Sequence, residues 1–251
     1  MLIGPLCKYL GLQVSRIISR PLFASSIAVD RLNGHVSYRL IAERELLQQS
    51  VDPDLELSAR FIRLACRRGD ICVGAFDGSL LVGYQWFALR TSPHVNGIWV
   101  DFDPGACYCY NQFVRPPHRG QHIAAGLTTY GGRLCINQGC RRTVAFIDLD
   151  NKSSWHAASR VGNRTVGYAG YLQCFGLFVS FRTPGAMRFG FRFYAPPHAA
   201  TYLAPTIVSD TTSARTCQSH IANPIALPPK LATSDLNEFT ECPRDKQAAA
   251  G

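Results

Sequence analysis

The sequence lacks the features that mark several large classes of protein. It has no run of about 18 apolar residues, the length that a membrane-spanning helix needs. Its N-terminal segment has no charged start leading into an apolar block, as a secretory signal would. Its ten cysteines are scattered, and the close pairs lack the spacing of a CxxC…CxxC zinc site: Cys107/Cys109 and Cys135/Cys140. We therefore expect a cytoplasmic protein with no membrane span, no metal, and reduced, mostly buried thiols.

Charge is scarce but biased towards one sign. Only 17% of the 251 residues are charged, yet the formal net charge is +9. Such a surface attracts anions, which include nucleic acid, acidic lipid and the phosphates of a cofactor. The arginines lie along the whole chain without a dense patch, and no aromatic RNA-binding signature is present, so we expect no specific nucleic-acid partner.

Hydrophobic periodicity predicts alternating strands and helices over the first four fifths of the chain. The predicted order is β-α-α-β-β-β-α-β-α-β-β, over residues 12–21, 37–50, 54–69, 71–78, 80–89, 107–114, 121–138, 141–149, 152–161, 166–182 and 186–195. This order indicates an α+β domain with a mixed sheet, not a doubly wound fold. The last part is polar and proline-containing, so we predict one domain over residues 1–198 and a disordered tail over 199–251.

The stretch "VRPPHRGQHIAAGL" joins a strand that ends at Val114 to a helix that begins near Gln121. The turn between them holds Arg115, His118 and Arg119 beside a flexible glycine. A helix N-terminus with basic side chains is suited to binding an anion such as phosphate. By local chemistry alone, a simple connecting turn with solvated arginines is an equal alternative.

Two blocks of the sequence resemble motifs of the GNAT-type N-acyltransferase superfamily. The first is "FVRPPHRGQHIAAGL", which is similar to the acyl-CoA-binding pattern V-x-P followed by [RQ]-x-x-G-x-[GA], with Arg119 and Ala124 matching. The second is "NKSSWHAASRVGN", which is similar to N-x-x-[AS]-x-x-x-Y-x-x-x-G-F, with Asn151, Ser154 and Gly162 in place. The resemblance implies a single domain whose central mixed, mostly antiparallel sheet is flanked by helices.

The resemblance also implies acetyl-CoA, or another acyl-CoA, as co-substrate. Its pantetheine would lie between two splayed strands, its pyrophosphate at the start of the following helix, and its thiol-bearing half near the second block. The implied cofactor-binding residues are Phe113, Val114, Arg119, Gly120, Gln121, His122, Ile123, Ala124, Asn151 and Ser154.

Three positions depart from the family pattern. His122 stands where the family usually has glycine, and its side chain either hinders the approach of phosphate or contacts it. Ala158 replaces the common tyrosine that protonates the departing thiolate, so the usual general acid is in doubt. Asn163 replaces a phenylalanine, a change that concerns packing.

The catalytic candidates are Tyr108, Tyr110 and His156, each of which also has an ordinary packing or surface interpretation. In a regular strand, Tyr108, Tyr110 and Gln112 would share one face, and Cys109, Asn111 and Phe113 the other. The carboxylates of Asp101 and Asp103 are alternative bases in the preceding loop.

The function predicted from the sequence is direct transfer of an acetyl or other acyl group from acyl-CoA to a primary amine. The acceptor would be a small molecule or a peptide, and a homodimer is an open alternative to a single chain. Two other functions stay open: an aminoacyl or long-chain acyl transferase on the same fold, and a noncatalytic acyl-CoA-binding module.

Overall fold

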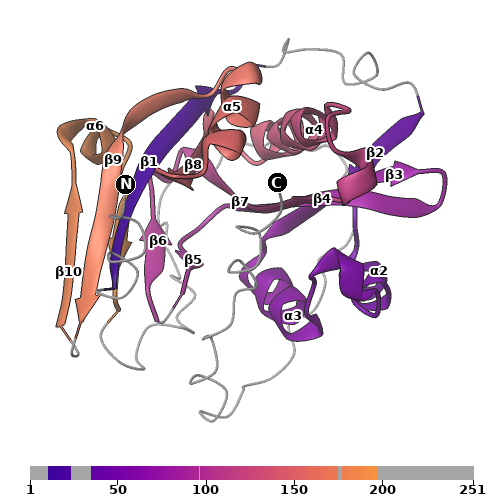
Figure 1. Ribbon diagram of the computed structural model, residues 1–251, viewed down its shortest axis with the longest axis horizontal. Helices are drawn as coiled ribbons and strands as arrows, with labels where there is room; N and C mark the ends of the chain where they lie inside the picture. Colours follow the sequence, from indigo (N-terminus) through magenta and orange to yellow (C-terminus); the bar gives the residue numbers. More distant parts are fainter. Residues whose placement is uncertain (1–10, 24–34, 96, 175–176, 197–251) are drawn as a thin grey trace, which may run out of the picture.

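The computed structural model describes residues 11–23, 35–95, 97–174 and 177–196. The predicted tail over 199–251 lies outside these residues. The main sheet has eight strands in the order β10-β9-β1-β8-β7-β4-β3-β2 (Figure 1). Its strands are β1 (Leu12–Pro21), β2 (Val36–Leu40), β3 (Ile71–Asp77), β4 (Leu80–Ala88), β7 (Ala106–Val114), β8 (Arg142–Asp148), β9 (Arg164–Cys174) and β10 (Leu177–Arg182).

A smaller sheet and seven helical segments complete the described fold. The smaller sheet has the order β11-β6-β5, with β5 (Ser92–Pro93), β6 (Trp99–Asp101) and β11 (Arg192–Tyr194). The α-helices are α2 (Glu43–Gln49), α3 (Ala59–Arg68), α4 (Ile123–Asn137), α5 (Lys152–Arg160) and α6 (Pro184–Arg188). Two short 3-10 segments are η2 (Pro53–Leu55) and η3 (Pro116–His118).

The main sheet is mixed because of a single parallel contact at its centre. Among the described strands, β7 and β8 pair in parallel and all other neighbours pair antiparallel. The parallel pairing joins Ala106–Tyr108 to Arg142–Val144, although both strands continue beyond it. The predicted α+β class with a mixed, mostly antiparallel sheet is therefore confirmed.

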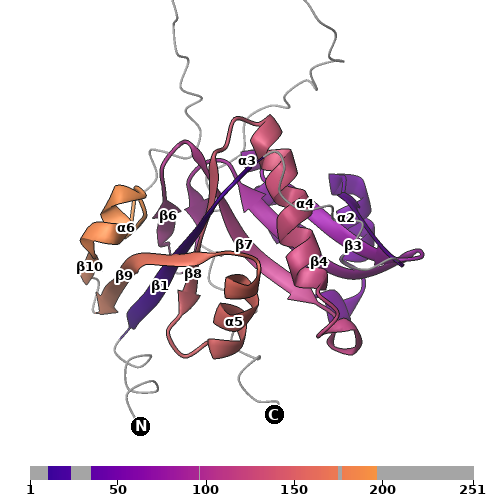
Figure 2. The ribbon, with the colours of Figure 1, turned by 90° about the horizontal axis from the view of Figure 1, so that it is seen from above.

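The two faces of the sheet carry cores of different composition. Helices α2 and α3 lie on one face and α4 and α5 on the other (Figures 1 and 2). The core beneath α3 is aromatic and includes Trp86, Tyr108 and Tyr110. The core beneath α4 is aliphatic and rich in cysteine.

The predicted helix over residues 37–50 is only half right. Val36–Leu40 forms strand β2, which pairs antiparallel with β3; in this pairing Leu40 lies opposite Val73. Helix α2 begins only at Glu43. The segment offers apolar residues at both strand and helix spacing. Pairing with a neighbouring strand, which local sequence does not reveal, decides between them.

The strands predicted over 166–182 and 186–195 also need correction. The first run forms two antiparallel strands, β9 and β10, and the second begins as helix α6 before the short strand β11. Pro184 occupies the first turn of α6, where a missing backbone N–H is tolerated. Phe191 and Phe193 are buried between the two sheets, which explains the apolar pattern of this segment.

The remaining predicted elements are present, with shifts of a few residues at their ends. The predicted strand over 12–21 has the bounds of β1. Ser58 caps the N-terminus of α3, later than predicted, and Gly69 ends this helix in the left-handed conformation at φ 82°. Gly139, at φ 84°, follows α4 as expected from the sequence. The short strands β5 and β6 were not predicted.

Candidate functional site

A cavity of about 560 Å³ opens where β7 and β8 separate. Their pairing ends at Tyr108 and Val144, so the residues beyond it on both strands face a gap that no ladder closes. Helix α4 lies beside β7, and α5 lies near β8 (Figure 2). Residues of both helices line the cavity. Predicted site residues that line it are Tyr110, Phe113, Ala124, Asn151 and Ser154.

A bulge in β7 shapes one wall of this cavity. Tyr110 pairs with Trp86 and Phe113 with Tyr84, so two residues of β7, Asn111 and Gln112, lie opposite Gln85 alone. Asn111 has a left-handed backbone at φ 44°. The extra residue leaves part of the backbone of β7 without a partner in the ladder.

The bulge corrects the predicted faces of β7. Phe113 packs in the same aromatic core as Tyr108 and Tyr110, and not on the face of Cys109. The side chain of Gln112 lies on the α4 side, where its amide donates hydrogen bonds to Gln85 Oε1 at 3.0 Å and to the Ala124 carbonyl at 3.1 Å. In a regular strand, side chains alternate between the two faces of the sheet. The residue inserted at the bulge reverses this alternation for the residues that follow it.

The N-terminus of α4 begins in an unusual backbone conformation. His122 is the N-cap residue, with φ 61° and ψ 12°, and its side chain makes no capping hydrogen bond. Its exposed side chain occupies a position where glycine would have the required φ without steric cost. The first backbone bond runs from the Gly126 N–H to the His122 carbonyl, so the N–H groups before it have no acceptor within the helix. Ala124 and Ala125, in this first turn, line the cavity.

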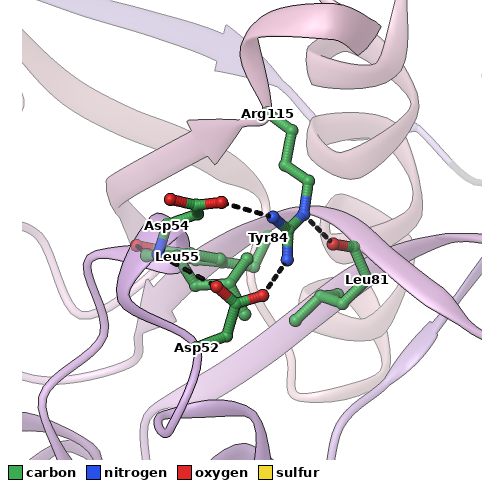
Figure 3. Close-up of polar contacts among 6 residues, drawn as sticks. All are labelled: Asp52, Asp54, Leu55, Leu81, Tyr84 and Arg115. Atoms are coloured by element: carbon green, nitrogen blue, oxygen red, sulfur yellow. Dashed lines mark hydrogen bonds and ion pairs between the residues drawn. The ribbon is translucent and has the colours of Figure 1, made fainter.

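Arg115 is engaged in ion pairs at the side of this turn (Figure 3). Its guanidinium pairs with Asp52, lies 3.7 Å from Asp54 Oδ2, and donates from Nε to the Leu81 carbonyl at 2.8 Å. These contacts tie the end of β7 to η2 and offset the charge of Arg115. Its predicted contribution to an anion site is therefore replaced by a structural one.

The other two basic residues of the turn differ in exposure. His118 Nε2 lies 3.8 Å from Asp77 Oδ2, at the edge of ion-pairing distance. Arg119 is exposed and donates from Nε to the Val114 carbonyl at 3.1 Å, so its side chain lies across the turn. The exposed side chain of Arg119 is therefore the basic group of this turn that a solvent anion reaches most directly.

The second block of the sequence forms the N-terminus and body of α5. Asn151 is the N-cap, and its Oδ1 accepts hydrogen bonds from the Ser154 N–H at 3.0 Å and the Ser153 hydroxyl at 3.1 Å. Ala158 lines the cavity, where the family pattern has a tyrosine. The methyl group leaves space at this position and supplies no proton.

Tyr110 belongs to a buried polar cluster. Its hydroxyl donates to Asp70 Oδ2 at 2.6 Å, and Arg68 pairs with the same oxygen at 2.6 Å. Burial, with the Asp70 carboxylate, raises the pKa of Tyr110 well above its ordinary value. Burial likewise raises the pKa of Asp70, against the lowering effect of Arg68. Tyr110 is therefore a weak proton donor in this state.

The other catalytic candidates lie away from the cavity lining. Tyr108 is buried and stacks on Tyr110, with ring centroids 5.4 Å apart. His156 is exposed on α5. Asp101 pairs with Arg192 at 2.8 Å, and Asp103 accepts a hydrogen bond from a backbone N–H in its own turn. Their proposed chemistry stays a prediction.

Three carboxylates that the sequence alone did not single out line the cavity. Glu56 follows η2, Asp148 ends β8, and Asp150 precedes α5. Asp148 accepts hydrogen bonds from Gln13 and Ser15 of β1. The end of a strand next to a recognised motif is a signal that could have indicated Asp148, whereas Glu56 is brought to the site only by the tertiary fold.

The arrangement of the central strands is the one that the sequence resemblance implies. The family model described as "Acetyltransferase (GNAT) family" matches residues 38–162, and the chain belongs to this family. The match includes the strand, turn and helix of the first block and most of the second.

Solved structures similar to the chain include several acetyltransferases. A GCN5-related N-acetyltransferase from Sphaerobacter thermophilus is 14% identical, with 71% of this chain and 55% of that chain covered and a TM-score of 0.44. The aminoglycoside antibiotic 6'-N-acetyltransferase AAC(6')-Ih from Acinetobacter baumannii is 17% identical, with 51% and 89% covered and a TM-score of 0.40. AAC(6')-Iy in complex with a CoA bisubstrate analog is 18% identical, with 51% and 90% covered and a TM-score of 0.42. No curated protein matches the chain.

Two features are absent from the described residues. Within residues 11–23, 35–95, 97–174 and 177–196, no helix has the length and apolar character needed to cross a membrane. In the same ranges, no group of three or more His, Cys, Asp or Glu side chains is arranged to hold a metal ion.

Proposed function

We propose that this protein is an acyl-CoA-dependent N-acyltransferase that moves an acetyl group directly to a primary amine. The observation that carries the proposal is the cavity between β7 and β8, bordered by the N-terminus of α4 and by α5. The lining combines apolar and polar side chains with Ala124 and Ala125 of the first turn of α4. The N-terminus of α4 suits a pyrophosphate, and the unpaired ends of β7 and β8 suit a pantetheine arm that binds between them.

The proposed cofactor site extends the geometry of the α4 turn. The amides at Ala124 and Ala125 face the pyrophosphate, and Arg119 adds positive charge. The unpaired backbone near Asn111 and the end of β7 at Phe113 and Val114 bind the pantetheine amides. The cofactor-binding set implied by the sequence, from Arg119 to Ala124 with Asn151 and Ser154 opposite, is retained in this proposal.

The charge of the cavity indicates a cationic acceptor. Three carboxylates line the cavity near β8 and η2: Glu56, Asp148 and Asp150. The one lysine ammonium in the lining is that of Lys152, so negative charge exceeds positive charge there. The chain as a whole carries a formal charge of +9. A locally acidic cleft in a basic protein attracts a protonated amine, and a carboxylate in contact with that amine can take its proton before attack.

Catalysis in this proposal depends chiefly on positioning. After the protonated amine gives up one proton, its nitrogen attacks the thioester carbonyl. The nitrogen loses a second proton as the C–S bond breaks, and the CoA thiolate takes up a proton. Ala158 supplies no acid for that last step, and the hydroxyl of Tyr110 donates to Asp70. Holding amine and thioester together supplies much of the rate enhancement by itself. Tyr108 and His156, which lie outside the cavity lining, are the other proton carriers in this proposal.

The first test is calorimetric titration with acetyl-CoA, followed by an assay of thiol release with a panel of amines. We expect binding in the wild type and weaker binding in Arg119→Ala. The matched control is Arg63→Ala, which removes an exposed arginine of α3 away from the cavity. Equal affinity in both variants would remove Arg119 from the site, and no binding to the folded wild type would overturn the proposal.

A second function is a noncatalytic acyl-CoA-binding module. The observation that favours it is the absence of a cavity-lining hydroxyl at Ala158 together with the engaged hydroxyl of Tyr110. Tight binding of acetyl-CoA without thiol release from any amine in the panel would support this module over the enzyme.

A further inference from the structure

Two carboxylates of the cavity lining belong to elements on opposite sides of β7. Asp148 ends β8, and Glu56 follows η2, which is bonded to β4. In the main sheet, β4 and β8 are the two neighbours of β7. Because neighbouring strands lie about 4.8 Å apart, β4 and β8 are about 10 Å apart across β7, and farther where β7 and β8 separate. The two carboxylates therefore enter the cavity from different sides.

Glu56 belongs to a segment that is fixed to the sheet. The Tyr84 hydroxyl donates to the Leu55 carbonyl at 2.9 Å, and the Leu55 side chain is buried (Figure 3). Arg115, just after β7, pairs with Asp52 at the start of η2. Glu56 itself has an exposed side chain. Its position is thus set by the residues before it, while its carboxylate is accessible to a ligand in the cavity.

Asp148 is fixed by contacts with β1. Its Oδ1 accepts hydrogen bonds from Gln13 Nε2 and from Ser15 Oγ, the latter at 3.1 Å. Ser15 lies directly opposite Asp148 in the antiparallel pairing of β1 and β8, and it is fully buried. Phe146, two residues before Asp148, shares its face of the sheet and packs against the aromatic core. The Asp148 carboxylate therefore lies on the same face as that core.

The Glu56 segment lies on this face too, and at the same level along the strands. The parallel register of β7 and β8, continued past its last pair, sets Asp148 level with Gln112. The next residue, Phe113, pairs with Tyr84 of β4. Tyr84 belongs to the aromatic core and holds the segment of Glu56. Glu56 and Asp148 therefore face a common space, with the end of β7 between them.

Aromatic side chains line the cavity on this face. Phe113 stacks on Tyr84 with ring centroids 5.4 Å apart, and Phe146 also lines the cavity. Such rings pack against methylene groups, and their faces attract cations. The one cationic side chain among the described lining residues, Lys152, belongs to α5 on the opposite face (Figures 1 and 2). This part of the cavity suits a ligand with an apolar middle and a positive charge towards each carboxylate.

We propose that the acceptor is a small molecule with two cationic nitrogens, in which Asp148 binds the reacting ammonium and Glu56 binds the second one. The proposal rests on the acyltransferase function proposed above. Asp148 takes the reacting end because β8 borders the gap assigned to the thioester arm. Glu56 lies across β7 from that gap, so the group that it binds keeps its charge during the reaction. Tyr84 is a positioning residue, which acts through the segment of Glu56.

Pairs of amines that differ only in the second charge test the proposal. Hexylamine has a methyl group where cadaverine has its second ammonium, and pentylamine is related to putrescine in the same way. We expect kcat/KM for thiol release from acetyl-CoA to be at least about 10-fold higher for each diamine, because only the diamine forms a charged hydrogen bond with Glu56. The gain should come from a lower KM at similar kcat.

Four variants assign the two ends of the acceptor. Glu56→Gln should remove the preference by raising KM for the diamines alone, and Tyr84→Phe, which keeps the ring, should reduce it. The matched control is Asp54→Asn, which removes an exposed carboxylate of the same segment outside the cavity lining and should keep the preference. Asp148→Asn should slow diamines and monoamines alike, so that the preference is also kept.

A binding measurement separates this inference from the proposed function, because it needs no turnover. In calorimetric titrations with CoA present, we expect the wild type to bind cadaverine more tightly than hexylamine and Glu56→Gln to bind both alike. Preferential binding of cadaverine without thiol release would support the site and overturn the acyltransferase.

The opposite results overturn the site and leave the acyltransferase intact. They are thiol release at equal kcat/KM from diamines and monoamines, a preference that survives in Glu56→Gln, or a preference that is lost in Asp54→Asn. Loss of the preference in Asp148→Asn, with Glu56→Gln unaffected, would likewise contradict the role of Glu56.

Discussion

Two helices begin beside the same cavity, and they begin in opposite ways. At α5, Asn151 caps the helix through hydrogen bonds from Ser153 and Ser154. At α4, His122 adopts a left-handed conformation and its side chain caps nothing. A side chain accepts a hydrogen bond from one of the first N–H groups of α5, whereas the His122 side chain accepts none from those of α4.

This difference predicts a structural terminus at α5 and a binding terminus at α4. A helix N-terminus attracts anions, but the attraction weakens where a side chain already occupies its amides. The phosphates of an acyl-CoA should therefore bind at α4, and the acyl end should lie towards α5. Matched substitutions at the N-termini of α4 and α5 test whether the two helices differ in this way.

The largest expected effect comes from adding a carboxylate to the first turn of α4. In Ala124→Glu, the new charge would occupy the proposed phosphate position, and we expect acetyl-CoA affinity to fall at least about 100-fold, or about 2.7 kcal/mol. Ser153→Glu makes the matched change in the first turn of α5 and should reduce affinity far less. Calorimetric titration of both variants with acetyl-CoA measures the two affinities. Equal losses of affinity would mean that the phosphates do not bind preferentially at α4.

The second effect concerns the stability of the two caps. Asn151→Ala removes the acceptor for the Ser154 N–H, and we expect the free energy of unfolding to fall by about 1 kcal/mol. His122→Ala removes a side chain that accepts no capping bond and should change it by less than about 0.5 kcal/mol. Urea denaturation of both variants measures the difference, and a larger loss at His122 would contradict the comparison.

The sequence predicts the positions of both helix termini, but not the long-range contacts around them. The strand, turn and helix order was readable because Val114, the prolines and the apolar helix positions act locally. The bulge at Asn111 was not, because it arises from the register of β7 against β4. The role of Arg115 was missed for a similar reason: its partner Asp52 lies 63 residues away in sequence.

The same limit applies to the segments that were assigned wrongly. Residues 37–40 and 186–188 carry apolar residues that fit either of two secondary structures. Pairing of Tyr38 with Ala75 on β3 and the position of Pro184 in α6 settled the choice. Local spacing thus identified the elements around the cavity, while the tertiary fold alone brought Glu56 to its lining.

The third effect isolates the backbone strain at α4. His122→Gly replaces a residue at φ 61° with glycine, which adopts this conformation without steric strain. We expect the free energy of unfolding to rise by up to about 1 kcal/mol. Gln121→Gly, next to it, has no left-handed backbone to relieve and should be destabilising. Thermal or urea unfolding compares them, and a destabilised His122→Gly would show that the imidazole itself holds the turn.

The smallest effect concerns the ion pair that holds the α4 side of the cavity. The hydrogen bond from Arg115 lowers the pKa of Asp52. A carboxyl group whose pKa is lower in the folded protein adds stability above its unfolded pKa of about 3.9, and this stability is lost as the pH falls through the folded pKa. Asp52→Asn keeps the side-chain oxygen that accepts from the Asp54 N–H and removes only the charge.

We therefore expect the wild type to exceed Asp52→Asn in unfolding free energy at pH 7, with the difference shrinking as urea titrations are repeated at lower pH. Asp54→Asn changes the more exposed carboxylate, 3.7 Å from the same guanidinium, and should show a smaller difference. Solvent screens the Asp54 pair more strongly, so the ranking follows from exposure. A difference for Asp52→Asn that did not vary with pH would show that Arg115 holds the α4 turn through hydrogen-bond geometry and not through charge.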